Sequence, residues 1–208
     1  MKYKKVVASL LCFFSVFIIW CQQEAKATKL VVEATQLNVP IIKTNFTLIA
    51  SKKIAKVKQA IQQGDTRFLP AYKKLLKDAD HAMEEGVFSV TQKSQVAPSG
   101  DKHDYLSLAP YWWPDPTKIE GLPWIRKDGE INPMTRGSNV DHPGKDKMIS
   151  NVKNLSLAFL FSNHVVYAEK TKELIRVWFL EESTRMNPNL DYAQGVPGKS
   201  DGRGFGII

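Results

Sequence analysis

The sequence predicts an all-α fold of helical hairpins joined by long ordered loops, on three observations. Apolar residues recur at helical spacing over residues 46–63, 70–86, 147–163 and 166–182. The connections within each pair of helices are short, which is typical of antiparallel hairpins. Residues 87–146, between the two pairs, have no helical period but carry many aromatic side chains, which favours an ordered loop over disorder.

The helices follow from their apolar residues and their end signals. The first helix alternates lysines with Ala50, Ile54, Val57 and Ile61. Gly64 ends it, Pro70 suits the first turn of the next helix, and Gly86 closes that one. The second hairpin repeats the spacing at Met148, Val152, Leu155 and Phe159, and then at Tyr167, Leu174, Ile175 and Trp178. His164 is expected to end the first of these two helices, where a cation suits the helix dipole.

The N-terminus predicts an export signal. A basic start precedes an apolar run over residues 6–20, and Ala25-Lys26-Ala27 offers a small-x-small cleavage site. Residues 1–27 are therefore expected to be a signal peptide, residues 28–44 a linker or extended segment, and the protein exported, either periplasmic or secreted. The alternative is a lipoprotein acylated at Cys21, which is less favoured because the bulky Trp20 precedes the cysteine.

Composition narrows the class of protein. The chain has 208 residues, a net charge of +8, and ordinary globular fractions of hydrophobic and charged residues. It lacks the motifs of nucleotide-binding loops, zinc peptidases and common serine hydrolases. No uncharged run after the N-terminus is long enough to span a membrane. Because an exported protein seldom meets nucleic acid, the positive charge favours an anionic polysaccharide as partner, with a merely solvated basic surface as the alternative.

Two segments carry the residues expected to bind substrate. Over residues 101–116, prolines hold adjacent aromatic side chains, and apolar faces of sugar rings stack on such platforms, although the loop could instead only cover a helical core. Residues 185–204 gather amides and an arginine that can bind hydroxyls and carboxylates, although Asn-Pro and Gly-rich steps also favour plain turns. The candidate substrate-binding residues are His103, Tyr105, Tyr111, Trp112, Trp113, Asn187, Asn189, Tyr192, Gln194 and Arg203.

The long loop over residues 87–146 also contains two histidines. His103 and His142 each lie beside an aspartate and are candidate site residues. The spacing of the four histidines fits no metal-binding pattern, so we expect neither a metal nor a cofactor.

Four stretches have an unusual composition: HDYLSLAPYWWPDP at 103–116, GLPWIRKDGEINP at 121–133, RMNPNLDYAQGVPG at 185–198 and GRGFGII at 202–208. In this order they resemble the alginate lyase family of polysaccharide lyases, over about residues 45 to 208. The resemblance implies an incomplete α/α toroid of antiparallel helical hairpins. It also implies cleavage of alginate or a related polyuronate by β-elimination, with no metal required.

The chain departs from that family in one respect. The family uses an Asn-His pair, an Arg and a Tyr to neutralise the C5 carboxylate, remove the α-proton and protonate the leaving oxygen. Asn163-His164 does not match this pair, because its flanks and its position before residues 185–198 do not fit. The catalytic residues are therefore expected beyond Ile208. Residues 45–208 are expected to be the substrate-binding N-terminal portion of an apparently truncated toroid domain, poorly stable and inactive alone.

Two other functions remain open. The same aromatic platform would suit a non-catalytic secreted glycan-binding protein. An α/α-barrel glycoside hydrolase would need two carboxylates across the sugar bond, and no pair stands out among Asp101, Asp104, Asp115 and Asp191. The ultraviolet absorbance of an unsaturated uronate product distinguishes a lyase from both.

We predict that the mature chain starts near Thr28, because the basic, apolar and Ala-x-Ala segments lie in the order that signal peptidase requires. N-terminal sequencing of the protein exported by its host measures the start. An acylated Cys21 at the mature N-terminus would contradict the prediction and support the lipoprotein alternative.

Overall fold

The computed structural model describes residues 50–204. The expected signal peptide, the segment 28–44 and the apolar residues that close the sequence lie outside the described residues. The chain divides into two compact units, residues 1–56 and 57–208, and the boundary falls inside the first described helix.

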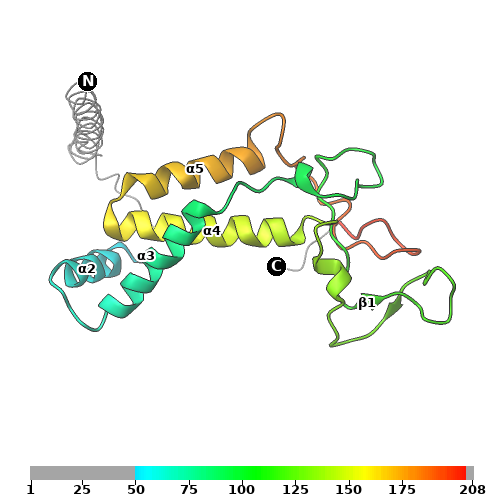
Figure 1. Ribbon diagram of the computed structural model, residues 1–208, viewed down its shortest axis with the longest axis horizontal. Helices are drawn as coiled ribbons and strands as arrows, with labels where there is room; N and C mark the ends of the chain where they lie inside the picture. The colour runs from blue at the N-terminus through cyan, green and yellow to red at the C-terminus, as the bar shows by residue number, and fades with distance from the viewer. Residues whose placement is uncertain (1–49, 205–208) are drawn as a thin grey trace, which may run out of the picture. The chain divides into compact units, whose positions relative to one another are not determined.

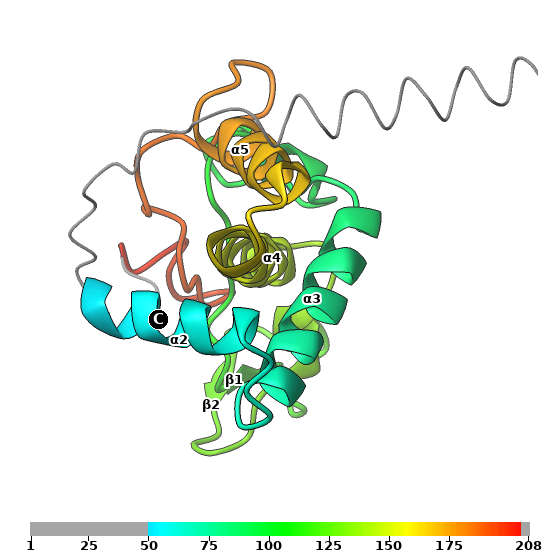
Figure 2. The same cartoon turned by 90° about the vertical axis from the view of Figure 1, so that its left-hand side faces the viewer.

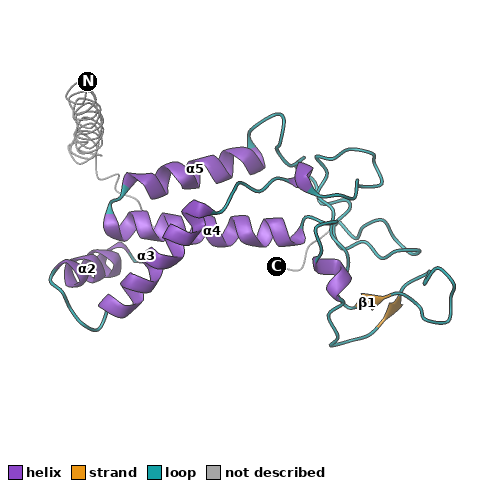
Figure 3. Ribbon diagram, in the orientation of Figure 1, coloured by secondary structure: helices purple, strands orange, loops and turns teal. Residues whose placement is uncertain are grey.

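Helices dominate the described residues, and the predicted all-α class is confirmed (Figures 1 and 3). The α-helices are α2 (Ser51–Gln62), α3 (Leu69–Glu84), α4 (His142–Ser162) and α5 (Val165–Phe179). Two 3₁₀ helices, η1 (Val90–Gln92) and η2 (Pro133–Arg136), lie between α3 and α4. The same stretch contains the short strands β1 (Trp112–Trp113) and β2 (Ile125–Arg126), which pair antiparallel and which the sequence pattern did not indicate.

The predicted start of the third helix needs correction, while its predicted end at residue 163 lies within one residue of the observed end. α4 begins at His142 and not at residue 147, because Pro143 fits a first helical turn, so His142 is the first residue of a helix and not part of a loop. At the other end, Asn163 adopts a left-handed backbone (φ 61°) and terminates α4. His164 is therefore the N-cap of α5. His164 thus follows the C-cap of α4, and its expected interaction with the dipole of that helix stays a prediction.

α3 and α5 both pack on α4 (Figure 2). The core between these helices comprises Ala79, Ala82, Leu155, Ala158, Tyr167 and Leu174. The alanines bring the backbones close, while Leu155 and Leu174 fill the remaining space. Tyr167 is buried with its hydroxyl satisfied, since it donates to Asp80 Oδ1 at 2.6 Å. Among the described residues, no helix is long and apolar enough to cross a membrane.

The two segments singled out in the sequence run side by side. Residues Leu108 and Gly195 form a parallel bridge, in which the Gly195 N–H donates to Ser107 O and the Ala109 N–H donates to Gly195 O. A Cβ added at Gly195 would lie 2.6 Å from the carbonyl oxygen of Asp201, so only glycine fits where residue 195 passes Asp201. Beneath the two segments, a second core of Val90, Tyr105, Met148, Trp178 and Ala193 joins them to α4 and α5.

A buried ion pair joins the loops to the start of α4. The Lys93 ammonium lies 3.1 Å from Asp141 Oδ2, and both side chains are almost completely buried, at 1% and 2% exposure. Lys93 Nζ also donates to the carbonyl oxygens of Val90 and Lys102, both at 2.7 Å. Asp141 Oδ2 accepts the Leu106 N–H at 2.7 Å. Burial outweighs these favourable contacts and raises the pKa of Asp141 to about 6.

We predict that Lys93→Met destabilises the fold by about 3–5 kcal/mol near neutral pH, because it leaves the Asp141 carboxylate buried without its partner. The pKa of Asp141 is raised to about 6 in the folded protein from the ordinary value of 3.8. Without Lys93 the pKa of the Asp141 carboxyl should rise further, so the folded variant binds this proton at a higher pH than the wild type does, and the loss should become smaller as the pH falls from neutral through about 6. Urea unfolding at neutral pH and near pH 5 measures the loss of unfolding free energy.

The matched control breaks an exposed pair. Arg126 and Asp128 lie 2.6 Å apart with side chains that are 63% and 70% exposed. Asp128→Ala should therefore cost at most about 1 kcal/mol, with little dependence on pH. Equal losses in the two variants would contradict a special role for the buried pair.

Candidate functional site

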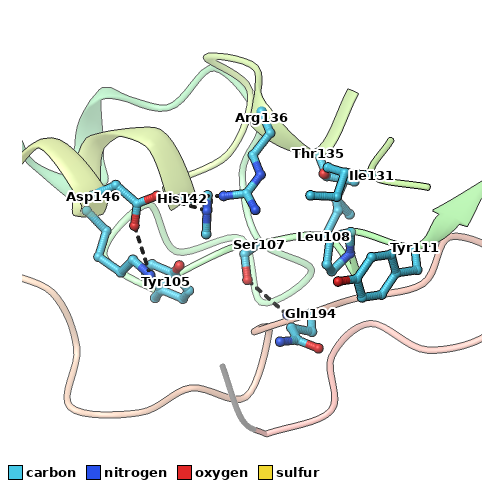
Figure 4. Close-up of a pocket in the computed structure, with 12 residues that line it drawn as sticks. Tyr105, Ser107, Leu108, Tyr111, Ile131, Thr135, Arg136, His142, Asp146 and Gln194 are labelled. Atoms are coloured by element: carbon cyan, nitrogen blue, oxygen red, sulfur yellow. Dashed lines mark hydrogen bonds and ion pairs between the residues drawn. The ribbon is translucent and has the colours of Figure 1, made fainter. Parts of the chain in front are cut away.

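A cavity of about 270 Å³ opens where the long loop, η2 and the start of α4 meet (Figure 4). Its lining combines aliphatic side chains with aromatic, basic, neutral polar and acidic ones. The aromatic residues are Tyr105 and Tyr111, the basic residues are Arg136, His142 and Lys145, and the neutral polar residues include Ser107, Thr135 and Gln194. The single carboxylate among the described lining residues is that of Asp146.

A network of side-chain hydrogen bonds fixes the wall that carries Arg136. Asn132 is fully buried, and its Oδ1 accepts the Met134 N–H at 3.0 Å, which starts η2. The Nδ2 of Asn132 donates to the Trp112 carbonyl at 2.8 Å. Thr135 Oγ1 donates to Asn132 O at 2.7 Å. These bonds attach η2 to the aromatic strand, so the position of Arg136 depends on the fold of the long loop.

His142 and Lys145 come from the first turn of α4. Burial lowers the pKa of His142, and the nearby Asp146 carboxylate opposes this shift without reversing it. His142 Nε2 is buried and lies 3.0 Å from Asp146 Oδ2, but it has no hydrogen-bond partner within residues 50–204. Because its pKa is lowered from the ordinary value of 6.5, the imidazole is mainly neutral at neutral pH.

The structure brings three of the ten candidate substrate-binding residues to this cavity, together with the candidate His142. Tyr111 is half-buried and lies on the cavity wall (Figure 4). Tyr105 also lines it but is 4% exposed and belongs to the core, and burial raises its pKa to about 12. Gln194 has a left-handed backbone (φ 55°), its N–H donates to Ser107 Oγ at 2.9 Å, and its Oε1 accepts a hydrogen bond from Arg203. Arg203 thus contacts the lining through Gln194.

Three other predicted residues lie outside the cavity and cross-link the two segments. The amides of Asn187 and Asn189 donate to Asp104 Oδ1 at 2.8 and 3.1 Å. Burial favours a higher pKa for Asp104, but hydrogen bonds from Ser99 and these two asparagines outweigh it and lower the pKa. His103 Nδ1 lies 2.7 Å from the carbonyl oxygen of Arg185. These contacts use the polar groups that sugar binding would need.

The tryptophan pair and Tyr192 also lie away from the cavity. Trp112 packs on the buried Trp124 cluster, and Lys199 Nζ lies 4.7 Å from the centre of its ring. Trp113 donates from Nε1 to Glu130 O at 3.0 Å, and Lys127 Nζ lies 5.0 Å from its ring. Both rings are half-buried, so the sugar-facing role of this pair stays a prediction. Tyr192 contributes its carbonyl oxygen to the Ser107 N–H.

Sequence reasoning missed Arg136, Lys145 and Asp146. His142 and Asp146 are four residues apart, the spacing that places two side chains on one helix face. That signal was hidden because the helix was expected to begin five residues later than it does. Across residues 50–204, no group of three or more histidine, cysteine or acidic residues could hold a metal ion.

Comparisons with known proteins agree on one family. The alginate lyase family matches residues 89–208, which is more than half of the chain. Among solved structures, an alginate lyase from Bacteroides ovatus is 46% identical with a TM-score of 0.72, and the match covers 77% of this chain and 41% of that lyase. This likeness confirms the incomplete α/α toroid as the fold class. No curated protein matches the chain. The chain therefore belongs to the alginate lyase family.

Proposed function

We propose that the chain is a polysaccharide lyase of the alginate lyase type, and that the cavity between η2 and α4 binds one uronate of an anionic polysaccharide. The observation that carries the proposal is the cavity itself, whose lining combines Arg136, His142 and Lys145 with the ring of Tyr111. A uronate presents a carboxylate together with an apolar ring face. The two kinds of wall match these two parts of the sugar.

The basic side chains also suit the chemistry of β-elimination. The proton removed in this reaction lies beside the sugar carboxylate and becomes more acidic when that carboxylate is neutralised. Arg136 can offer two parallel N–H donors to a carboxylate, and Lys145 adds a compact charge. The amide of Gln194 can bind a hydroxyl of the same sugar.

We assign binding rather than proton transfer to these residues. The chain spans 41% of the Bacteroides ovatus lyase, less than half of its length. We propose that the groups that remove and return the proton lie outside the 208 residues, as the resemblance implies. An exported location suits this proposal, because a polysaccharide is too large to enter a cell.

We predict that Arg136→Ala weakens the binding of an alginate oligosaccharide by on the order of 10-fold or more, because a charge-assisted hydrogen bond is lost. Calorimetric titration of the chain at low salt measures the dissociation constant. Arg126→Ala is the matched control, since Arg126 is an exposed arginine on β2 that does not line the cavity. An equal effect in the two variants would show that the charge of the whole protein, and not the cavity, attracts the oligosaccharide.

We also predict that the 208-residue chain binds alginate but releases no unsaturated uronate, because elimination requires neutraliser, base and acid at one sugar. Ultraviolet absorbance of the reaction mixture measures the product. Turnover by the purified chain would contradict the assignment of binding alone. Release of reducing ends without this absorbance would instead favour a glycoside hydrolase.

A further inference from the structure

Asp146 contacts all three basic residues of the cavity. Its Oδ2 lies 3.0 Å from His142 Nε2 and 3.6 Å from Arg136 Nη1. Its Oδ1 lies 3.2 Å from Lys145 Nζ. Figure 4 shows the carboxylate directed across the cavity wall toward His142. One carboxylate therefore gathers side chains from η2 and from α4 around a single point.

The charges of the cavity can be counted. Arg136 and Lys145 each carry a positive charge, and Asp146 carries a negative one. His142 is neutral at neutral pH because burial lowers its pKa, and Tyr105 is neutral because burial raises its pKa to about 12. The lining thus has one net positive charge, which equals the charge that one sugar carboxylate neutralises.

Fold stability gives only a small reason for this carboxylate. The Asp146 side chain is 53% exposed, and exposed ion pairs contribute little to stability. A charge that faces a cavity acts strongly on a ligand inside it, because the walls replace much of the screening water. The effect of Asp146 should therefore appear in ligand binding.

We propose, building on the uronate site above, that Asp146 is a specificity-determining residue that holds Arg136, His142 and Lys145 together and sets the cavity to accept a singly charged sugar. Without Asp146 the lining would carry two net positive charges. Such a cavity would hold anions more tightly and would favour sugars that bear a second negative charge. Asp146 limits both effects.

The pairing with His142 adds a dependence on pH. The charged or titratable groups around this imidazole are Asp146 and Lys145 on α4, Arg136 on η2, Tyr105 on the long loop, and the adjacent Asp141 with its partner Lys93. When the pH falls below the lowered pKa of His142, the cavity gains a positive charge and anion binding strengthens. Asp146 favours the charged imidazole, so this step should move to still lower pH when Asp146 is neutralised.

The test is Asp146→Asn, an exposed and nearly isosteric change. We expect an alginate trisaccharide to bind roughly 3- to 10-fold more tightly at low salt, since one nearby repulsive charge is removed. A sulfated uronate oligosaccharide should gain by a larger factor, and the salt dependence should steepen. NMR titration of the His142 ring should show a lower pKa than in the wild type. His142→Gln should abolish the step in binding that this histidine causes, while any step from Asp141 remains.

Asp128→Asn is the matched control, because it changes the charge of the protein by the same amount at a residue outside the cavity. Its affinities should equal those of the wild type. If the wild type binds the trisaccharide and Asp146→Asn matches it in affinity, charge preference and His142 pKa, the inference is overturned while the proposed function stands. If neither the wild type nor any variant binds a uronate, the proposed function fails and the inference fails with it.

Discussion

The buried pair of Lys93 and Asp141 is the contact on which the candidate site depends. It links the end of η1 and the loop at residues 102–106 to Asp141, the residue that precedes α4 and lies 35 residues after Leu106. A buried pair of this kind costs desolvation energy, as the raised pKa of Asp141 shows. The pair instead fixes the geometry, because the Lys93 ammonium can contact the Asp141 carboxylate and the carbonyl oxygens of Val90 and Lys102 together in one arrangement only. The first turn of α4 is thereby fixed against the loop that supplies Tyr105 and Tyr111.

The sequence revealed the helices better than the site. Apolar periodicity and the glycine and proline signals were enough to place four helices, since packing of α3 and α5 on α4 rests on that periodicity. The start of α4 was placed too late because the first turn, from His142 to Asp146, is polar and faces a cavity. A helix segment with no apolar face gives no periodic signal. The β1–β2 pair was missed because two-residue strands are too short to show alternation.

The ten candidate substrate-binding residues differ in whether another group of the protein already occupies their polar atoms. Tyr111 and Gln194 line the cavity. They contribute to it the aromatic area and the amide polarity for which the sequence analysis singled them out. Asn187 and Asn189 have the same chemistry, but the buried carboxylate of Asp104 takes their donors. Their partner comes from a segment more than eighty residues earlier. Residue type alone cannot distinguish a sugar-binding residue from a structural cross-link when the competing acceptor, here Asp104, is that far away in sequence.

Asp141 and His142 are consecutive residues with different roles. Asp141 belongs to the buried ion pair, and His142 lines the cavity. An insertion or deletion between residues 141 and 146 would turn every following side chain of α4 by about 100° per residue and separate the cavity from its support. The tip between β1 and β2 is different, because residues 116–120 are exposed and Ile119 contacts solvent fully. Changes of length can accumulate at that tip and leave the first turn of α4 untouched. We therefore expect relatives of this chain to differ in the length of the loop between β1 and β2 and to keep the spacing of residues at the start of α4.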